Sequence, residues 1–408
     1  MKTLGHLLLV AGFMLAGMCG ALVVVNLIPN DRLLSHVRSS ISRTNYESSQ
    51  LGLGRGVDFY SECIAATVGL GPGAEQLPLV SRSFLSPVIG SCDEFQEYVN
   101  GKTNKGFNYW RYWHGYQILS RPLLYIFTLY GVHYVLTLLF LLSAAFFASQ
   151  VARLCGWSLV IAFFCVPIGA QVAIIPHSMI WIIAFSISGW LLLPSTNSAK
   201  EGHSPYVWFL VLGMLCCFFD LLTVPLVTLT LPLLGLYWKG EFDGDNQKLT
   251  LHSICILSAL WLAGYSICWA TKWAIASVIG ERGVITAISN VIQYRLGIGS
   301  GPLGDASVTA ARSIIINARA CWYGWLIVSG LAITRIRPLA AAMLSKKEWS
   351  LSAVLVPLVL FGMPMLWLAV VEQHSVWHSW FVARIYFTSF AIMLSAILAP
   401  QIRPGGGA

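Results

Sequence analysis

The chain has 408 residues, of which 57% are hydrophobic and 10% are charged, and its formal net charge is +8. So large an apolar share excludes an ordinary soluble domain and indicates helices that face lipid. Lys and Arg residues are scattered between apolar runs rather than gathered in one stripe. This pattern argues against nucleic acid and favours membrane lipids or phosphate-bearing substrates as partners.

The first apolar run covers residues 7–28 and follows Lys2. It is long for a signal peptide, and no small-x-small cleavage site follows it, so we expect residues 1–29 to hold an uncleaved first transmembrane helix. A polar segment then covers residues 30–121, where we expect a periplasmic loop with short interfacial helices. Cys63 and Cys92 lie in this loop and are natural disulfide partners if it faces an oxidising periplasm.

Beyond this loop the apolar runs follow one another closely. Several are near the roughly 20 residues that cross a bilayer, and others are short enough to imply re-entrant or broken helices. We expect an all-α polytopic membrane protein with about ten transmembrane helices. Helices 2–7 fall within residues 122–271, a second periplasmic loop within 272–319, and helices 8–10 with a short cytoplasmic tail within 320–408. The expected later spans are 122–150, 155–173, 177–194, 206–220, 222–238, 251–271, 320–334, 351–371 and 383–399.

The basic residues of the short loops give the orientation. Ten crossings place the short loops around Arg153, Lys200, Lys239 and Arg335, and the tail with Arg403, on the side of Lys2, and each of these carries Lys or Arg, as the positive-inside rule requires. We therefore expect a bacterial inner-membrane protein with both termini in the cytoplasm. Most acidic residues then fall on the periplasmic face, where we expect the active site.

Two carboxylates in the first loop are candidates for the catalytic base. Asp58 and Glu62 are four residues apart, so a helix would place both on one face. A neighbouring pair of acids suits the activation of a hydroxyl. Asp58 is preferred because the glycines before it let the backbone bend close to a substrate, and Glu62 has a supporting role. The alternative is an ordinary amphipathic surface helix held by Cys63.

Other ionisable residues gather at the expected periplasmic ends of helices. Such residues are expensive at membrane depth and are functional suspects, although each could be a helix cap or part of an aromatic belt. His374 and His378 are four apart, but no third ligand is evident, so no metal site is assigned. The candidates for substrate or phosphate binding are Arg111, His114, His177, Asp220, Lys272, His374, His378 and Arg384.

Several short motifs resemble those of bacterial GT-C glycosyltransferases, membrane enzymes that use polyprenyl-phosphate sugars. They are Arg111-Tyr-Trp-His-Gly-Tyr116, Pro176-His-Ser178, Phe219-Asp-Leu-Leu-Thr223, Trp269-Ala-Thr-Lys-Trp273 and His374-Ser-x-x-His378. The comparison extends to lipid-linked arabinofuranosyltransferases of the cell-wall or type IV pilin sort.

The resemblance implies an inverting transfer from a lipid-linked sugar donor to a glycan or pilin-like protein, with an Asp base and no need for a divalent metal. Two alternatives remain open: an O-antigen ligase or polymerase, and a transporter or flippase of lipid-linked glycans.

Overall fold

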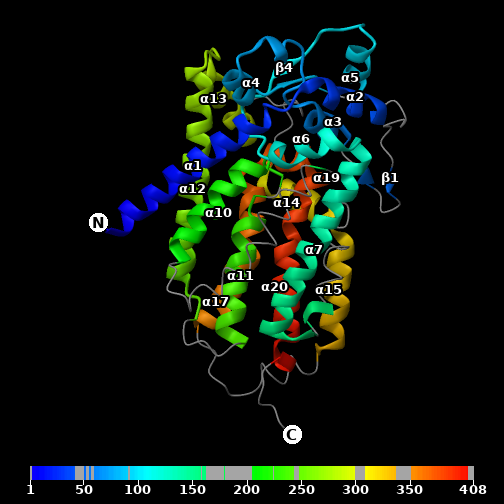
Figure 1. Cartoon of the computed structure of the whole chain (residues 1–408). Coiled ribbons are helices and arrows are strands. Elements are labelled where there is room, and N and C mark those ends of the chain that lie inside the picture. The colour runs from blue at the N-terminus through cyan, green and yellow to red at the C-terminus, as the bar shows by residue number, and fades with distance from the viewer. Residues whose placement is uncertain are drawn as a thin grey trace.

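The computed structural model is mainly a bundle of helices with a cap of short elements at one end (Figure 1). It describes residues 2–41, 50–51, 55–56, 59–90, 92–157, 159–161, 179, 205–223, 225–242, 248–298, 308–336 and 351–402. Two short antiparallel ribbons are the sheet structure of this part of the chain.

The bundle is built from long apolar helices that bury one face against their neighbours. The most extensive contact between two helices is that of α10 with α12, and α20 packs against α11, α15 and α17. The bundle helices are α1 (Lys2–Val25), α7 (Leu129–Cys155), α10 (Pro205–Phe219), α11 (Val227–Phe242), α12 (Leu251–Val278), α15 (Trp322–Thr334), α17 (Leu351–Val370) and α20 (Tyr386–Ile402).

The cap comprises the elements between α1 and α7, and Figure 1 shows it in blue and cyan at the top of the bundle. Short interfacial helices were expected in this segment. Its helices are α2 (Asn30–Ile41), α3 (Phe59–Thr67), η1 (Ala74–Gln76), α4 (Leu79–Leu85), α5 (Cys92–Val99) and α6 (Gln117–Ile126). Its ribbons pair β1 (Gln50–Leu51) with β2 (Arg55–Gly56), and β3 (Pro87–Val88) with β4 (Phe107–Asn108).

The segment expected to be the second loop is largely helical. It contains α13 (Val284–Arg295) and α14 (Ala310–Ala320), and α12 runs through Lys272 to Val278 instead of ending beside it. Further along the chain, the short elements α18 (Glu372–Trp377), α19 (Ser379–Val382) and η5 (Ala383–Ile385) join α17 to α20.

The expected count of ten transmembrane helices is not confirmed. Within the described residues, three helices are long and apolar enough to cross a membrane, at Leu4–Val25, Leu129–Arg153 and Leu251–Val278. The pair α14 and α15, bent by 75°, would be a fourth if it forms one span. Helix α10 has 15 residues, and at 1.5 Å per residue such a helix is shorter than the roughly 30 Å of hydrocarbon. Most of the expected spans 155–173 and 177–194 lies outside the described residues.

Arg121 joins the cap to the end of the first helix. Its buried guanidinium donates hydrogen bonds to the carbonyls of Val25 (3.1 Å), Ile28 (3.2 Å) and Val68 (3.3 Å), and to Asn30 Oδ1 (2.6 Å). The carbonyls at a helix C-terminus have no partner within the helix, and a cation there also complements the helix dipole. Arg121 therefore fixes the direction in which the chain leaves α1.

Three hydrogen bonds attach the cap to α12. Lys272 Nζ donates to the carbonyl of Phe84 (2.6 Å), Trp113 Nε1 to the carbonyl of Cys268 (3.0 Å), and Trp273 Nε1 to the carbonyl of Arg111 (3.3 Å). The α12 residues in these bonds, Cys268, Lys272 and Trp273, lie within two turns of that helix. This attachment places the chain segment before α6 directly beside that helix.

A disulfide joins Cys63 of α3 to Cys92 of α5, with 5.2 Å between the Cα atoms and a sequence separation of 29. These are the two cysteines that were expected to pair. The bond closes the part of the cap that carries Glu62.

We predict that replacing Cys63 and Cys92 with serine destabilises the cap by about 3–4 kcal/mol, because the unfolded chain regains the entropy that a loop of this length removes. Denaturant unfolding measures the loss, and mass spectrometry of non-reduced peptides should find the linked pair. Cys255→Ser is the control, because Cys255 is exposed and free. Free thiols at both positions 63 and 92 would contradict the prediction.

Two glycines allow α10 and α12 to touch along their backbones. A Cβ added at Gly213 would lie 1.9 Å from the carbonyl oxygen of Trp261, and one added at Gly264 would lie 2.1 Å from that of Leu210. Small residues at a helix contact permit such an approach in membrane proteins.

We predict that Gly264→Ala pushes the two helices apart and destabilises the protein by about 1–3 kcal/mol, as overpacking does. Thermal unfolding in detergent should show a lower midpoint. Gly12→Ala is the matched control, because Gly12 is also inside a helix but has nothing within 4 Å of an added Cβ. Equal midpoints for the two variants would show that the close approach is unimportant.

Candidate functional site

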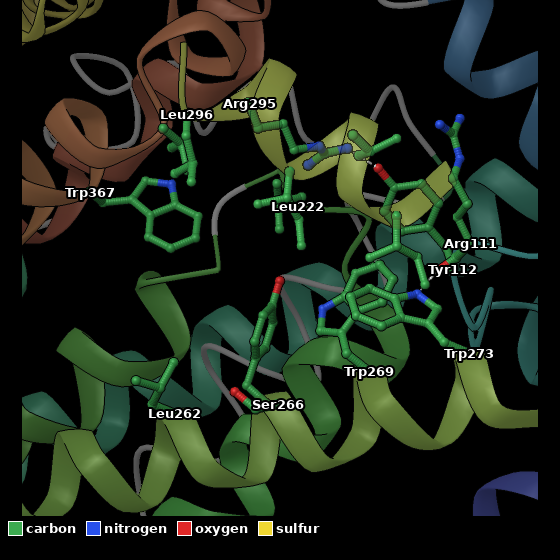
Figure 2. Close-up of a pocket in the computed structure, with 15 residues that line it drawn as sticks. Arg111, Tyr112, Leu222, Leu262, Ser266, Trp269, Trp273, Arg295, Leu296 and Trp367 are labelled. Atoms are coloured by element: carbon green, nitrogen blue, oxygen red, sulfur yellow. Dashed lines mark hydrogen bonds between the residues drawn. The ribbon is translucent and has the colours of Figure 1, made fainter. Parts of the chain in front are cut away.

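A cavity of about 320 Å³ lies where the cap meets the bundle. Its walls come from α12, α13, α17, the chain before α6 and the turn between α10 and α11. The volume falls within the roughly 300–1,000 Å³ usual for small-molecule sites. Most of the lining is apolar, and several of the lining side chains are aromatic (Figure 2).

One face of α12 forms the aromatic wall of this cavity. Tyr265, Trp269 and Trp273 are spaced by four residues, so their side chains leave the helix on the same side. Neighbouring ring centres are 6.3 Å and 5.1 Å apart, and the Tyr112 ring lies 5.3 Å from Trp269 at 62°. In Figure 2 Trp269 and Trp273 rise from α12 toward Tyr112. This wall suits an apolar chain.

Two arginines supply the positive charge of the cavity. Arg295, at the end of α13, donates a hydrogen bond to the Tyr112 hydroxyl, drawn as a dashed line in Figure 2. The guanidinium of Arg111 lies 5.4 Å from the centre of the Tyr109 ring. Neither ion pair found among the described residues includes Arg111 or Arg295. Guanidinium groups without a carboxylate partner suit a phosphate.

A turn between α10 and α11 brings a leucine into the same cavity. Asp220 Oδ1 accepts hydrogen bonds from the backbone N–H of Thr223 (2.9 Å) and from its hydroxyl. His374 Nε2 lies 3.0 Å from the carbonyl of Leu222, whose side chain lines the cavity. Asp220 and His374, two of the predicted site residues, are therefore connected to the cavity wall by their hydrogen bonds to this turn.

His114 is fully buried and does not line the cavity. Burial lowers the pKa of His114 to about 3, so the ring is neutral at physiological pH. Its Nε2 lies 2.8 Å from the carbonyl of Tyr109 and therefore donates, which leaves Nδ1 to accept from the Tyr116 hydroxyl at 3.0 Å. A buried imidazole with both nitrogens engaged in this way is uncharged. His114 shapes the loop that carries Arg111.

Lys272 is likewise not among the residues that line the cavity. It is fully buried, is bonded to the Phe84 carbonyl, and lies 5.3 Å and 5.8 Å from the ring centres of Phe84 and Trp113. The ammonium is enclosed by the cap, and its role in holding a phosphate stays a prediction. Lys272 is a structural contact.

Glu62 forms a buried pair that the sequence did not reveal. Its Oε1 lies 2.6 Å from His133 Nε2, and its Oε2 accepts from the backbone N–H of Met179 at 2.9 Å. Both carboxylate oxygens are engaged, so Glu62 links α3 to the start of α7. An available signal was His133 itself, an ionisable residue within a long apolar run.

The predicted site residues that remain to be placed are His378, Arg384, Asp58 and His177. The His378 ring stacks on Phe381 and lies 4.7 Å from that of His374, and Arg384 is buried in η5. Within the described residues, no group of three or more His, Cys, Asp or Glu could hold a metal. Asp58 and His177 lie outside these residues.

Sequence reasoning missed most of the cavity wall. Tyr265 and Trp367 were not singled out, Tyr112 and Leu222 stood only inside longer motifs, and Arg295 was not among the candidate residues. The four-residue spacing of the aromatic stripe on α12 was a usable signal.

No family model, curated protein or solved structure matches the chain.

Proposed function

We propose that this protein is an integral membrane glycosyltransferase that takes a sugar from a polyprenyl-phosphate donor. The supporting observation is the cavity: an aromatic, apolar wall beside two arginines that lack a carboxylate partner within the described residues. The wall suits an isoprenoid chain, and Arg111 and Arg295 suit its phosphate. We propose that the cavity lies on the periplasmic side of a bacterial inner membrane, with both termini in the cytoplasm.

The proposed reaction inverts the anomeric carbon. The hydroxyl of a glycan or pilin-like acceptor attacks this carbon, the bond from carbon to the phosphate oxygen breaks, and polyprenyl phosphate leaves with the bonding electrons. Arginines already aimed at the leaving phosphate stabilise its developing charge. A carboxylate accepts the proton of the attacking hydroxyl.

Asp58 is the proposed base, and the environment of Glu62 supports this choice. Both oxygens of Glu62 are engaged, and the side chain has no exposed surface. A base must instead reach the hydroxyl that it deprotonates. Glu62 then acts as a support for the segment that carries Asp58.

The phosphate site leads to a binding prediction. Arg295→Gln should weaken binding of farnesyl phosphate about tenfold to a hundredfold, because a hydrogen bond to a charged group contributes roughly 1.5–3 kcal/mol. Binding of farnesol should change little, since it lacks the phosphate. Titration into protein in nanodiscs measures both, with Arg312→Gln as control because Arg312 is exposed on α14. An equal loss for both ligands would refute the phosphate site.

The catalytic assignment leads to a turnover prediction. Asp58→Asn keeps the shape and removes the basicity, so release of decaprenyl phosphate from decaprenyl-phosphoryl arabinofuranose should fall about 10²–10⁴-fold while farnesyl phosphate binding persists. Glu62→Gln should reduce turnover clearly less.

A reversed order would make Glu62 the base. If neither variant loses activity, the base lies outside the first loop. Donor binding without any turnover by the unaltered protein would favour a flippase.

A further inference from the structure

Leu222 has a backbone conformation that a bulky residue rarely adopts. Its φ is 67°, in the left-handed region, and it is a buried residue of the cavity wall. Such a conformation costs free energy and persists only where surrounding contacts enforce it. The contacts around Leu222 must therefore offset this cost.

Two buried side chains hold the turn in place. Asp220 accepts the N–H and hydroxyl of Thr223, the residue after Leu222. His374 lies on the other side, with Nε2 3.0 Å from the Leu222 carbonyl. Burial and the nearby charge of Arg295 lower the pKa of His374 well below its ordinary value, so the ring is neutral. A carbonyl only accepts, so Nε2 carries the proton and donates it.

The held turn decides where the Leu222 side chain lies. Figure 2 shows Leu222 between the end of the cavity marked by Trp367 and the end marked by Arg111. A chain whose phosphate is held by the arginines passes Leu222 before it reaches Trp367. The branched end of this leucine is thus a fixed part of the wall beside that chain.

We infer that Leu222 is a specificity-determining residue that favours a methyl-branched isoprenoid chain over an unbranched one, with Asp220 and His374 as the residues that position it. This inference rests on the proposed lipid-phosphate donor and goes beyond it by assigning the choice of lipid to one turn. A side chain fixed in one position packs against the methyl groups of one chain shape, and a linear chain leaves that space unfilled.

The test compares farnesyl phosphate with dodecyl phosphate, which has the same main-chain length without methyl branches. The unaltered protein should prefer farnesyl phosphate, and Leu222→Ala should lower this preference about tenfold, as expected for one packing contact in an apolar pocket. Leu222→Gly should act likewise, and it adopts a positive φ without strain, which keeps the variant folded. Leu226→Ala, equally buried but outside the cavity lining, should keep the preference. An unchanged preference in Leu222→Gly overturns the inference.

A double-mutant cycle tests the positioning role of His374. His374→Ala should lower the preference, and His374→Gln should retain it because its amide N–H can also donate to the Leu222 carbonyl. In the Leu222→Gly background, His374→Ala should have no further effect on the preference. An equal loss of affinity for both lipids, or an effect that persists without the Leu222 side chain, overturns this role.

The proposed function and this inference fail differently. If the unaltered protein binds both phosphates with equal affinity, the lipid-phosphate site stands and the role of Leu222 is refuted. If it binds neither phosphate, the donor proposal and the inference are both refuted.

Discussion

The hydrogen bond from the Lys272 ammonium to the Phe84 carbonyl is the contact on which the cavity depends. A buried charge is costly unless it is compensated, and here a carbonyl at 2.6 Å and two aromatic faces surround it. The bond fastens α4 to α12 at the level of the aromatic stripe. The indole bonds of Trp113 and Trp273 lie on either side of it and hold the loop of Arg111 against the same helix. These three hydrogen bonds to α12 therefore hold together the aromatic wall of the cavity and the loop that carries Arg111.

Five ionisable residues in the described part of the chain fall into two groups with different tasks. Arg121, Lys272 and Glu62 are buried, and each forms a hydrogen bond with a backbone group of another segment. These residues therefore determine how the cap and the bundle fit together. Arg111 and Arg295 contact aromatic rings and the cavity instead. Ionisable groups at membrane depth are functional suspects by default. Here the contacts separate the two groups, since Arg121 and Lys272 donate to buried backbone carbonyls, whereas Arg111 and Arg295 line the cavity.

Two non-glycine residues in left-handed conformations flank the junction of cap and bundle. His114 has φ 55° and Leu222 has φ 67°, and each is held by hydrogen bonds of buried groups. Their turns also contact each other, since the Gly115 N–H donates to the Phe218 carbonyl at 2.9 Å. A Cβ at Gly115 would lie 2.3 Å from the Phe218 ring, so only glycine permits this approach. Of the two, Leu222 lines the cavity, and backbone strain in a cavity wall is the pattern expected of a site whose shape matters.

The sequence by itself determined the helical, membrane-directed character of the chain, the cysteine pair of the first loop and many of the buried polar residues, because hydropathy and local spacing are properties of neighbouring residues. It did not determine which charges face a ligand. Lys272 and Phe84 are 188 positions apart, and Arg121 and Val25 are 96 apart, so no local pattern could reveal that these cations bind carbonyls. The number of spans was also beyond it, since an apolar run reports burial without distinguishing lipid from protein. Only the tertiary structure decided what these cations contact, by bringing distant backbone groups to them.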